Sequence, residues 1–372
     1  MQHISPFQIY ATLIVMTIPI AFLEVPKRQL VSLGNNAWIA IALSLLPGLL
    51  ILFMYMFIIR RSQTPFPAML EEHFGSVAGR ILQIFYFVIE LGIAAFGIRL
   101  FVEFVESNVL PGTPISAYIV ILLLVCFSAL KSGLRTFVRT FEMITFLGLP
   151  LTMLILALGF AQPLNPENLL PIQTMSLKDL VIATASTSII LSRGFIILVL
   201  GKMTTDWSGV RRAVIGALLT YIMVMAVTVV LSLLMFSAST ARTLVFPTFT
   251  IIRSIEIGQF IQNIDIIFIG IWIMGMFATT TGTWYISLLS LQQALRLSSY
   301  RFLIAPTALI LGISSITMAE NILEVQILSN IIIPFLYGLA LFLIPLVIFL
   351  LVLFKPEASN QPAKSITVQN LD

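Results

Sequence analysis

The chain has 372 residues, of which 59% are hydrophobic and only 10% are charged, and its mean hydropathy is +1.06. A soluble domain carries roughly 25% charged residues, so polar side chains are too few here to cover a globule in water. The composition therefore excludes a soluble fold and predicts a chain surrounded by the lipid bilayer, and the net charge of +4 gives no indication of a nucleic-acid partner.

The predicted elements are membrane-crossing helices, each of which needs about 20 mostly apolar residues. Residues 1–6 contain no Lys or Arg, so the charged region of a cleavable signal peptide is missing, and we expect the first helix to stay as an anchor. Ten segments qualify as spans, and they are 7–30, 37–59, 81–107, 115–131, 141–161, 180–201, 213–236, 264–291, 302–319 and 328–354.

The long connection 237–263 contains Pro247 and a weakly amphipathic stretch from Thr248 to Gln262. We expect this stretch either to lie at the membrane interface or to re-enter the bilayer. After the last span, residues 355–372 form a short polar cytoplasmic tail that is predicted to be disordered.

Positive charges in the loops predict the orientation of the chain, because Lys and Arg accumulate on the inner side of a membrane. With the N-terminus inside, the inner loops and the tail hold 13 Lys and Arg residues and the outer side holds five. This distribution predicts that both termini lie inside and that the number of spans is even.

Two halves of opposite orientation follow, because five crossings reverse the side on which the next helix starts. We predict one permease-like membrane domain over 1–354, with repeat one at about 7–161 and repeat two at about 180–354. Carriers with such repeats interrupt the first helix of each half near the membrane midplane and bind substrate there. Pro19 in the first span and Ser192-Arg193-Gly194 in the sixth lie at similar depth and predict such interruptions, with ordinary kinks as the alternative.

Charged residues inside the predicted spans are costly and indicate a protein interior or a water-filled cavity. Glu90 and Arg193 either line a ligand pocket or pair with each other and lock the bundle. Arg99 and Glu103 are four residues apart and can pair on one helix face. Glu24, together with its neighbours Lys27 and Arg28, is expected at the outer interface.

The sixth and eighth spans also carry clusters of hydroxyl side chains. The run Thr279-Thr280-Thr281-Gly282-Thr283 and the run Ser186-Thr187-Ser188 can bond carbonyls of their own or a neighbouring helix, or supply hydroxyls to a pocket wall. Both alternatives stay open from the sequence.

Motifs for catalysis and cofactor binding are absent from the sequence. His3 and His73 lie far apart and Cys126 is the single cysteine, which predicts no metal cluster, no disulfide within the chain and no Ser/His/Asp catalytic set. No Gly-x-x-x-x-Gly-Lys-Ser/Thr loop for ATP occurs. We therefore expect that the chain is not an enzyme and needs no cofactor.

Four short motifs, in this order, carry a resemblance to a known family: Ile4-Ser5-Pro6-Phe7-Gln8, Asn35-Asn36-Ala37-Trp38-Ile39-Ala40, Phe246-Pro247-Thr248, and Phe260-Ile261 followed by Trp272. With the predicted spans and the polar tail, the chain resembles the B subunit of spore germinant receptors, which are related to amino-acid permeases. The resemblance covers nearly the whole chain.

The resemblance implies an all-α polytopic membrane protein with ten transmembrane helices in a 5+5 inverted repeat, the amino-acid-permease (LeuT-like) fold. It implies a small-molecule germinant, often an amino acid such as L-alanine, and assembly with a receptor A subunit and a lipoprotein C subunit in the inner spore membrane. The implied pocket comes from spans one, three, six and eight, and its residues here are Thr17, Ile18, Pro19, Ile20, Ala21, Glu90, Leu191, Ser192, Arg193, Gly194, Thr279, Thr280, Thr281 and Gly282.

Three functions are compatible with these features. The first is a germinant-receptor subunit that binds a small amino acid and passes the signal on by a shift of its conformational population. The alternative is a proton-coupled amino-acid transporter in which Glu90 carries the proton. A third is a structural scaffold for the partner subunits with a vestigial pocket.

Overall fold

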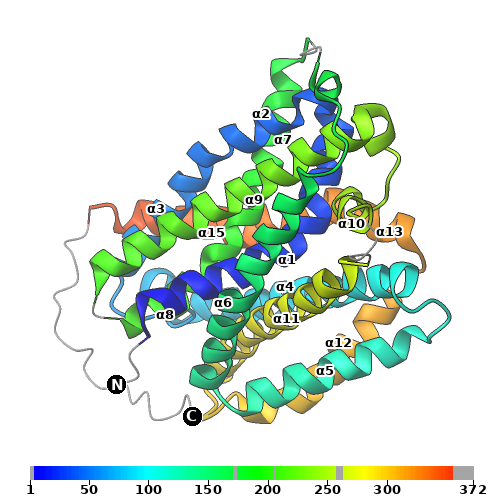
Figure 1. Cartoon of the computed structure of the whole chain (residues 1–372). Coiled ribbons are helices and arrows are strands. Elements are labelled where there is room, and N and C mark those ends of the chain that lie inside the picture. The colour runs from blue at the N-terminus through cyan, green and yellow to red at the C-terminus, as the bar shows by residue number, and fades with distance from the viewer. Residues whose placement is uncertain (1–3, 171–173, 205, 257–262, 355–372) are drawn as a thin grey trace.

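A computed structural model of the chain describes residues 4–170, 174–204, 206–256 and 263–354. All regular structure among these residues is helical (Figure 1). The predicted tail 355–372 and residues 257–262 of the long connection lie outside the described residues.

Helices occur at every predicted span, and the fourth span, 115–131, coincides with α5. The first half of the chain contains α1 (Pro6–Leu33), η1 (Gly34–Asn36), α2 (Ala37–Leu43), α3 (Leu45–Arg61), α4 (Met69–Asn108), α5 (Ile115–Lys131) and α6 (Leu134–Gly159). The second half contains η2 (Pro166–Leu169), α7 (Leu177–Ile190), η3 (Leu191–Ile196), α8 (Ile197–Leu200), η4 (Gly201–Met203), α9 (Trp207–Ala241), α10 (Pro247–Arg253), α11 (Asp265–Ala294), α12 (Arg301–Thr317), α13 (Ile322–Ile327), η5 (Leu328–Ile332), α14 (Ile333–Leu336), η6 (Tyr337–Leu343) and α15 (Ile344–Val352).

Seven helical stretches among the described residues are long and apolar enough to cross a membrane. The first of them, Pro6–Arg61, has 56 residues and includes two predicted spans, and α5 and α12 are shorter apolar helices. Apolar side chains also cover the outside of the bundle, for example Leu50 at 69%, Phe302 at 74% and Leu309 at 71% exposure. Only lipid tolerates such a surface, so the chain is a multi-pass membrane protein.

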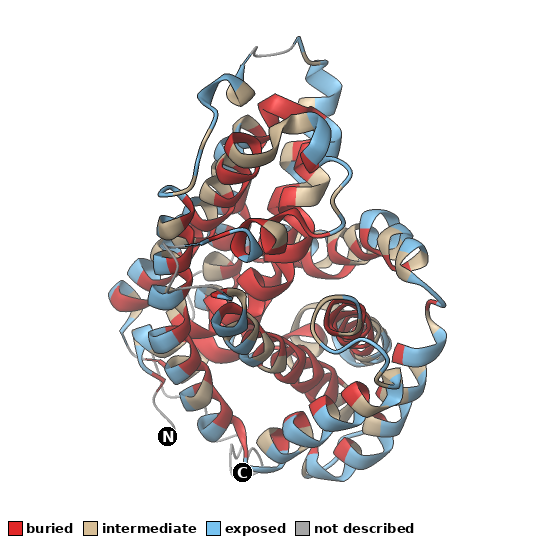
Figure 2. Ribbon diagram, turned by 45° about the vertical axis from the view of Figure 1, so that its right-hand side comes forward, coloured by how far each residue is buried: buried red, intermediate tan, exposed pale blue. Residues whose placement is uncertain are grey.

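Buried residues concentrate on the inner helices of the bundle (Figure 2). Helix α1 packs against α9, α11 and α6, and α4 lies along α11. Helices α5 and α12 pair at the periphery (Figure 1). The centre of the molecule is therefore the crossing of α1, α4 and α11, which positions the site described below.

Helix α1 begins at a capping box in which Gln8 N–H donates to Ser5 Oγ at 3.2 Å and Ser5 N–H donates to Gln8 Oε1 at 3.1 Å. Pro6 occupies the first turn, where its missing amide has no helical partner to lose. The helix then runs unbroken to Leu33 through Pro19 and Pro26. The predicted interruption of the first span at Pro19 is therefore wrong.

Threonines from other helices explain why the two prolines do not break α1. A proline removes the amide that would bond the carbonyl four residues earlier, here Val15 for Pro19 and Phe22 for Pro26. Thr279 Oγ1 donates to the Val15 carbonyl, and Thr248 Oγ1 donates to the Phe22 carbonyl at 2.9 Å. Both freed carbonyls thus regain a hydrogen bond in a setting without water.

The sixth span does lose its α-helical form where the sequence predicts it. Helix α7 ends at Ile190 and the chain continues as the 3₁₀ segment η3 before α8 resumes. No proline causes this change. The Ser192 carbonyl in the unwound segment accepts from Tyr55 Oη at 3.0 Å.

The last span changes hydrogen-bond register twice, since η5 and η6 are π-helical. Each π-helical stretch adjoins a short α-helix with a proline in its first turn, Pro334 in α14 and Pro345 in α15. The amides that these prolines lack shift the local bonding pattern. In η6, the Ala340 carbonyl accepts from Tyr86 Oη, and the Leu341 carbonyl shares the single Tyr55 O–H with the Ser192 carbonyl.

The connection between α9 and α11 has both buried and exposed residues over its described part. Its short helix α10 packs on α1 and α9, and Thr248, Phe249 and Ile252 are buried. Phe249 contacts Phe104 of α4 with ring centroids 4.9 Å apart. Helix α10 therefore packs on the bundle, and the interfacial and the re-entrant position both stay predictions.

Candidate functional site

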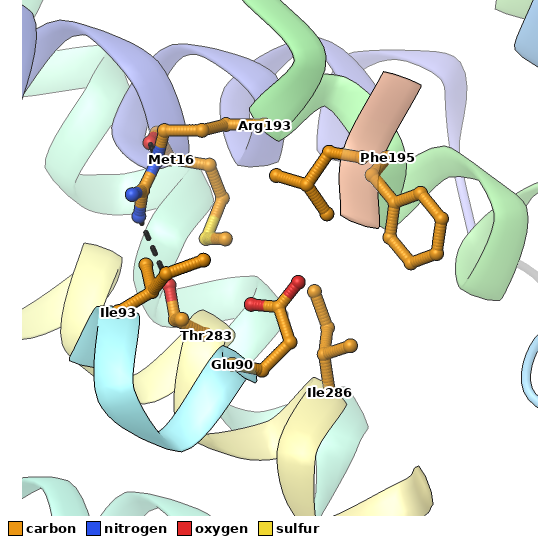
Figure 3. Close-up of a pocket in the computed structure, with 8 residues that line it drawn as sticks. Met16, Glu90, Ile93, Arg193, Phe195, Thr283 and Ile286 are labelled. Carbon is orange, nitrogen blue, oxygen red and sulfur yellow. Dashed lines mark hydrogen bonds between the residues drawn. The ribbon is translucent and has the colours of Figure 1, made fainter. Parts of the chain in front are cut away.

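A small cavity lies where α1, α4, η3, α11 and the last span meet (Figure 3). Its free volume is about 10 Å³, close to the smallest space that holds one water molecule. The site is therefore closed around almost no empty volume. Its lining consists of Met16, Glu90, Ile93, Arg193, Phe195, Thr283, Ile286 and Leu341.

Arg193 is the cationic side of this cavity and is only 3% exposed. Its Nε donates to the Met16 carbonyl at 2.6 Å and its Nη2 donates to Thr283 Oγ1 at 2.9 Å. Nη1 donates to Tyr337 Oη, and the guanidinium lies 5.6 Å from the centroid of that ring. The unwound η3 thus places one guanidinium fork against three separate elements, which a planar Arg can bridge.

Glu90 is the anionic side of the cavity and is 2% exposed. It projects from α4 towards the space opposite Arg193 (Figure 3). Its Oε1 has no hydrogen-bond partner among the described residues, and the two side chains form no ion pair. The alternative in which Glu90 and Arg193 pair directly is therefore wrong, although Arg193 does tie the bundle together through other partners.

An aromatic cluster closes the cavity on the side of the loop between α3 and α4. Phe195 stacks on Tyr86 at 5.4 Å, and Phe66 from that loop lies 4.6 Å from Phe195 and 4.9 Å from Tyr86. Phe66 N–H donates to the Leu198 carbonyl at 3.1 Å, and the side chain is 2% exposed. A loop residue therefore packs on Phe195, which lines the cavity.

The predicted site residues of the first span divide between three environments. Thr17 Oγ1 donates to the Leu13 carbonyl of its own helix. Ile18 and Pro19 line a second, apolar cavity of about 60 Å³ between α1, α6 and α11. Ile20 and Ala21 are buried in the core.

The other predicted residues are buried near the cavity but do not line it. In η3, Leu191, Ser192 and Gly194 are buried, and a Cβ on Gly194 would lie 2.7 Å from Leu52 Cδ2. In α11, Thr279 Oγ1 donates to the Val15 carbonyl, and Gly282 lies directly against Met16. Thr280 and Thr281 are buried beside them. Of the predicted site residues, the structure thus brings Glu90 and Arg193 to the cavity wall.

Sequence reasoning missed most of the lining. Thr283 belongs to the threonine run of the eighth span but was not among the predicted site residues. Its hydroxyl also donates to the Thr279 carbonyl at 2.9 Å. The remaining lining residues are apolar and carry no signal that separates them from lipid-facing residues; they are Met16, Ile93, Phe195, Ile286 and Leu341.

Two further groups of charges have clear partners. The predicted pair of Arg99 and Glu103 forms and is buried. Glu24 is buried at 7% exposure, and its place at the outer interface stays a prediction. Its Oε1 accepts from Ser329 Oγ at 2.6 Å, and its Oε2 lies 3.8 Å from Arg28 Nη2.

Comparison with known sequences gives one family over most of the chain. The model described as spore germination protein matches residues 3–323. Spore germination protein YndE of Bacillus subtilis (strain 168) is 27% identical and covers 70% of this chain and 72% of its own length. Spore germination protein KB of the same organism is 22% identical and covers 87% of both chains.

Comparison of the fold finds solved transporters. Mhp1, a nucleobase-cation-symport-1 family transporter in a closed conformation with bromovinylhydantoin bound, has a TM-score of 0.64 at 14% identity, covering 94% of this chain and 78% of its own. MhsT in complex with L-phenylalanine has a TM-score of 0.58 at 15% identity, with coverages of 95% and 98%. The chain therefore has a transporter fold of the LeuT-like class.

Proposed function

This chain belongs to the spore germination protein family, and on that premise we propose that it is the membrane subunit of a germinant receptor that binds a small amino acid and triggers germination. The ligand would occupy the cavity between Glu90 and Arg193. Ligand binding to one conformer would shift the population of the receptor towards its signalling state.

One observation carries this proposal: a buried carboxylate and a buried guanidinium face the same cavity without pairing with each other. Oε1 of Glu90 is a strong acceptor with no hydrogen-bond partner among the described side chains and backbone groups, and burial makes an unsatisfied acceptor costly. The ammonium of an amino acid would supply that partner, and its carboxylate would lie towards the cationic side of the cavity. MhsT was solved with L-phenylalanine bound, which makes amino acids the first ligand class to test.

The finer architecture and setting are part of the same proposal. We propose ten spans in two inverted sets of five, with both termini inside, in the inner spore membrane. The helices at every predicted span and the inner excess of Lys and Arg support this topology. A receptor A subunit and a lipoprotein C subunit would receive the signal, and the chain itself would catalyse no covalent reaction.

Equilibrium binding to the purified full chain in detergent tests the proposal. We expect saturable binding of at least one of alanine, valine or leucine. Glu90→Gln should lower the affinity at least about tenfold, because a neutral amide cannot form an ion pair with the ligand's ammonium group. Glu106→Gln on the same helix is the matched control and should bind normally. Absence of binding for every amino acid tested would remove the proposal.

The alternative function is proton-coupled amino-acid transport, and Glu90 is the observation that favours it. Intramembrane carboxylates serve as proton relays in pumps and transporters. Vesicles that contain only this chain decide between the two. Uptake that depends on a proton gradient and is lost in Glu90→Gln would favour the transporter, whereas binding without uptake would favour the receptor.

A further inference from the structure

Met16 lines the cavity between its two charged sides. Figure 3 shows its thioether end pointing between Arg193 and Glu90. The side chain is 2% exposed and lies flat on Gly282, where a Cβ would be 2.2 Å from Met16 Sδ and 3.2 Å from Cε. The absence of a side chain at Gly282 therefore leaves the space that Met16 occupies.

The backbone of Met16 is held by a hydrogen bond from a charged group. Its carbonyl accepts from Arg193 Nε at 2.6 Å within the unbroken helix α1. The side chain has three rotatable bonds and typically fills irregular gaps without fixing one conformation. A free amino acid is several times the size of a water molecule, which takes about 30 Å³ in the liquid, and cannot enter the remaining 10 Å³.

We propose that the Met16 side chain occupies the volume that the ligand's side chain takes on binding, so that Met16 sets the upper size of the ligand. This inference rests on the proposed function of the same cavity. The wall around Met16 is apolar, formed by Ile93, Ile286 and Leu341. The ligand class is therefore an amino acid with a small, apolar side chain.

Truncation of Met16 tests the inference through ligand preference. Met16→Ala removes Cγ, Sδ and Cε from the cavity, so we expect the affinity for leucine relative to alanine to rise at least about tenfold, as expected for added apolar groups that find a pocket. Met16→Leu conserves volume and should keep the wild-type ranking of alanine, valine and leucine. The measurement is calorimetric titration of the full chain in detergent with each of the three probes.

A second variant keeps the test independent of the first. Gly282→Ala places a methyl group against Sδ and should drive Met16 into the cavity, which lowers alanine affinity at least about tenfold. Combined Met16→Ala and Gly282→Ala removes the clash and should restore binding. Folding of each variant is checked by protection of the buried Cys126, the single cysteine, from a thiol-reactive dye.

The outcomes separate the inference from the function beneath it. If the wild type binds small amino acids but Met16→Ala keeps the same ranking and does not rescue Gly282→Ala, Met16 has no role in size selection and the inference falls while the receptor proposal stands. If no form of the chain binds any of the three probes, both fall together.

Discussion

The first span around Pro19 and the sixth span around Arg193 take equivalent places in the two predicted halves, yet only the second unwinds. Helix α1 contains two prolines and stays helical, whereas Leu191–Ile196 contains none and becomes a 3₁₀ segment. The two regions differ in which side chains donate hydrogen bonds to their backbone carbonyls. Threonine hydroxyls from α11 and α10 bond the carbonyls that Pro19 and Pro26 free, while Tyr55 bonds the Ser192 carbonyl of the unwound segment.

Proline alone therefore does not decide where this chain leaves the α-helical form, because hydroxyls from other helices bond the carbonyls that Pro19 and Pro26 free. The unwound segment also carries the charge that the cavity uses, and that charge in turn bonds the Met16 carbonyl of the intact helix. The two regions are therefore linked through one side chain, and the strongest test removes it.

Replacement of Arg193 by Met should have the largest effect. The change leaves the Met16 carbonyl, Thr283 and Tyr337 without their shared donor and removes the positive side of the cavity. We expect alanine binding to weaken at least about 100-fold. The free energy of unfolding should fall by about 2 kcal/mol, because three contacts between elements are lost and each contributes roughly 0.6 kcal/mol in a membrane. Heating the protein while dye labelling of Cys126 is followed gives the stability.

Arg253→Met, on the exposed end of α10, is the matched control and should change neither quantity. Arg193→Lys keeps the charge but cannot bridge three elements, so it should resemble Arg193→Met more than the wild type. Normal binding by Arg193→Met would show that the cavity does not use this charge.

Tyr55→Phe tests the unwound side of the comparison and should have the next largest effect. Tyr55 Oη lies within bonding reach of the Ser192 and Leu341 carbonyls, and the ring is fully buried. Loss of the hydroxyl should lower the free energy of unfolding by about 1–2 kcal/mol. Tyr221→Phe removes a hydroxyl that reaches the Thr187 carbonyl of regular helix α7 at 3.2 Å and should cost less. Equal costs would mean that the unwound segment places no special demand on Tyr55.

Thr279→Val tests the intact side, with an expected cost of about 1 kcal/mol in the free energy of unfolding. The Val15 carbonyl receives no helical amide because residue 19 is proline, and the change removes the Thr279 hydroxyl that donates to it instead. In a Pro19→Ala background the amide returns, so the same threonine change should cost much less. Thr280→Val is the control, since Thr280 Oγ1 has no hydrogen-bond partner among the described residues. The stability of all four variants is compared by the Cys126 assay.

The sequence predicts features that depend on local composition, and it does not predict features that depend on hydrogen bonds between distant residues. Hydropathy located the helices, including α5 at 115–131, because a lipid setting demands runs of apolar residues. The intramembrane charges Glu90 and Arg193 marked the cavity because burial without function is costly. The unbroken α1 was not predictable, since the rescue of Pro19 depends on Thr279, which lies 260 residues away in the chain.

Met16 shows the second limit of sequence reasoning. Its chemistry is that of any apolar residue in a span, and only its position over Gly282 distinguishes it. The same holds for Leu341, which lines the cavity from the π-helical segment η6. Such register changes arise from local backbone bonding around prolines and leave no trace in the period of the hydrophobic pattern.

Thr17→Val should have the smallest effect and completes the comparison. Its hydroxyl donates to the Leu13 carbonyl of α1, which unlike Val15 already receives a helical amide four residues later, from Thr17 itself. We expect the free energy of unfolding to stay within about 0.5 kcal/mol of the wild type. Thr248→Val, which exposes the freed Phe22 carbonyl, should cost about 1 kcal/mol in the same assay.

Alanine binding by Thr17→Val extends the test to the ligand site. The hydroxyl does not face the cavity between Glu90 and Arg193, so affinity should stay at the wild-type value. A tenfold loss of affinity without loss of stability would place Thr17 among the ligand contacts after all. In that event α1 must rotate or unwind when ligand binds, and the closed arrangement at Met16 would be only one of the two conformations between which the receptor shifts.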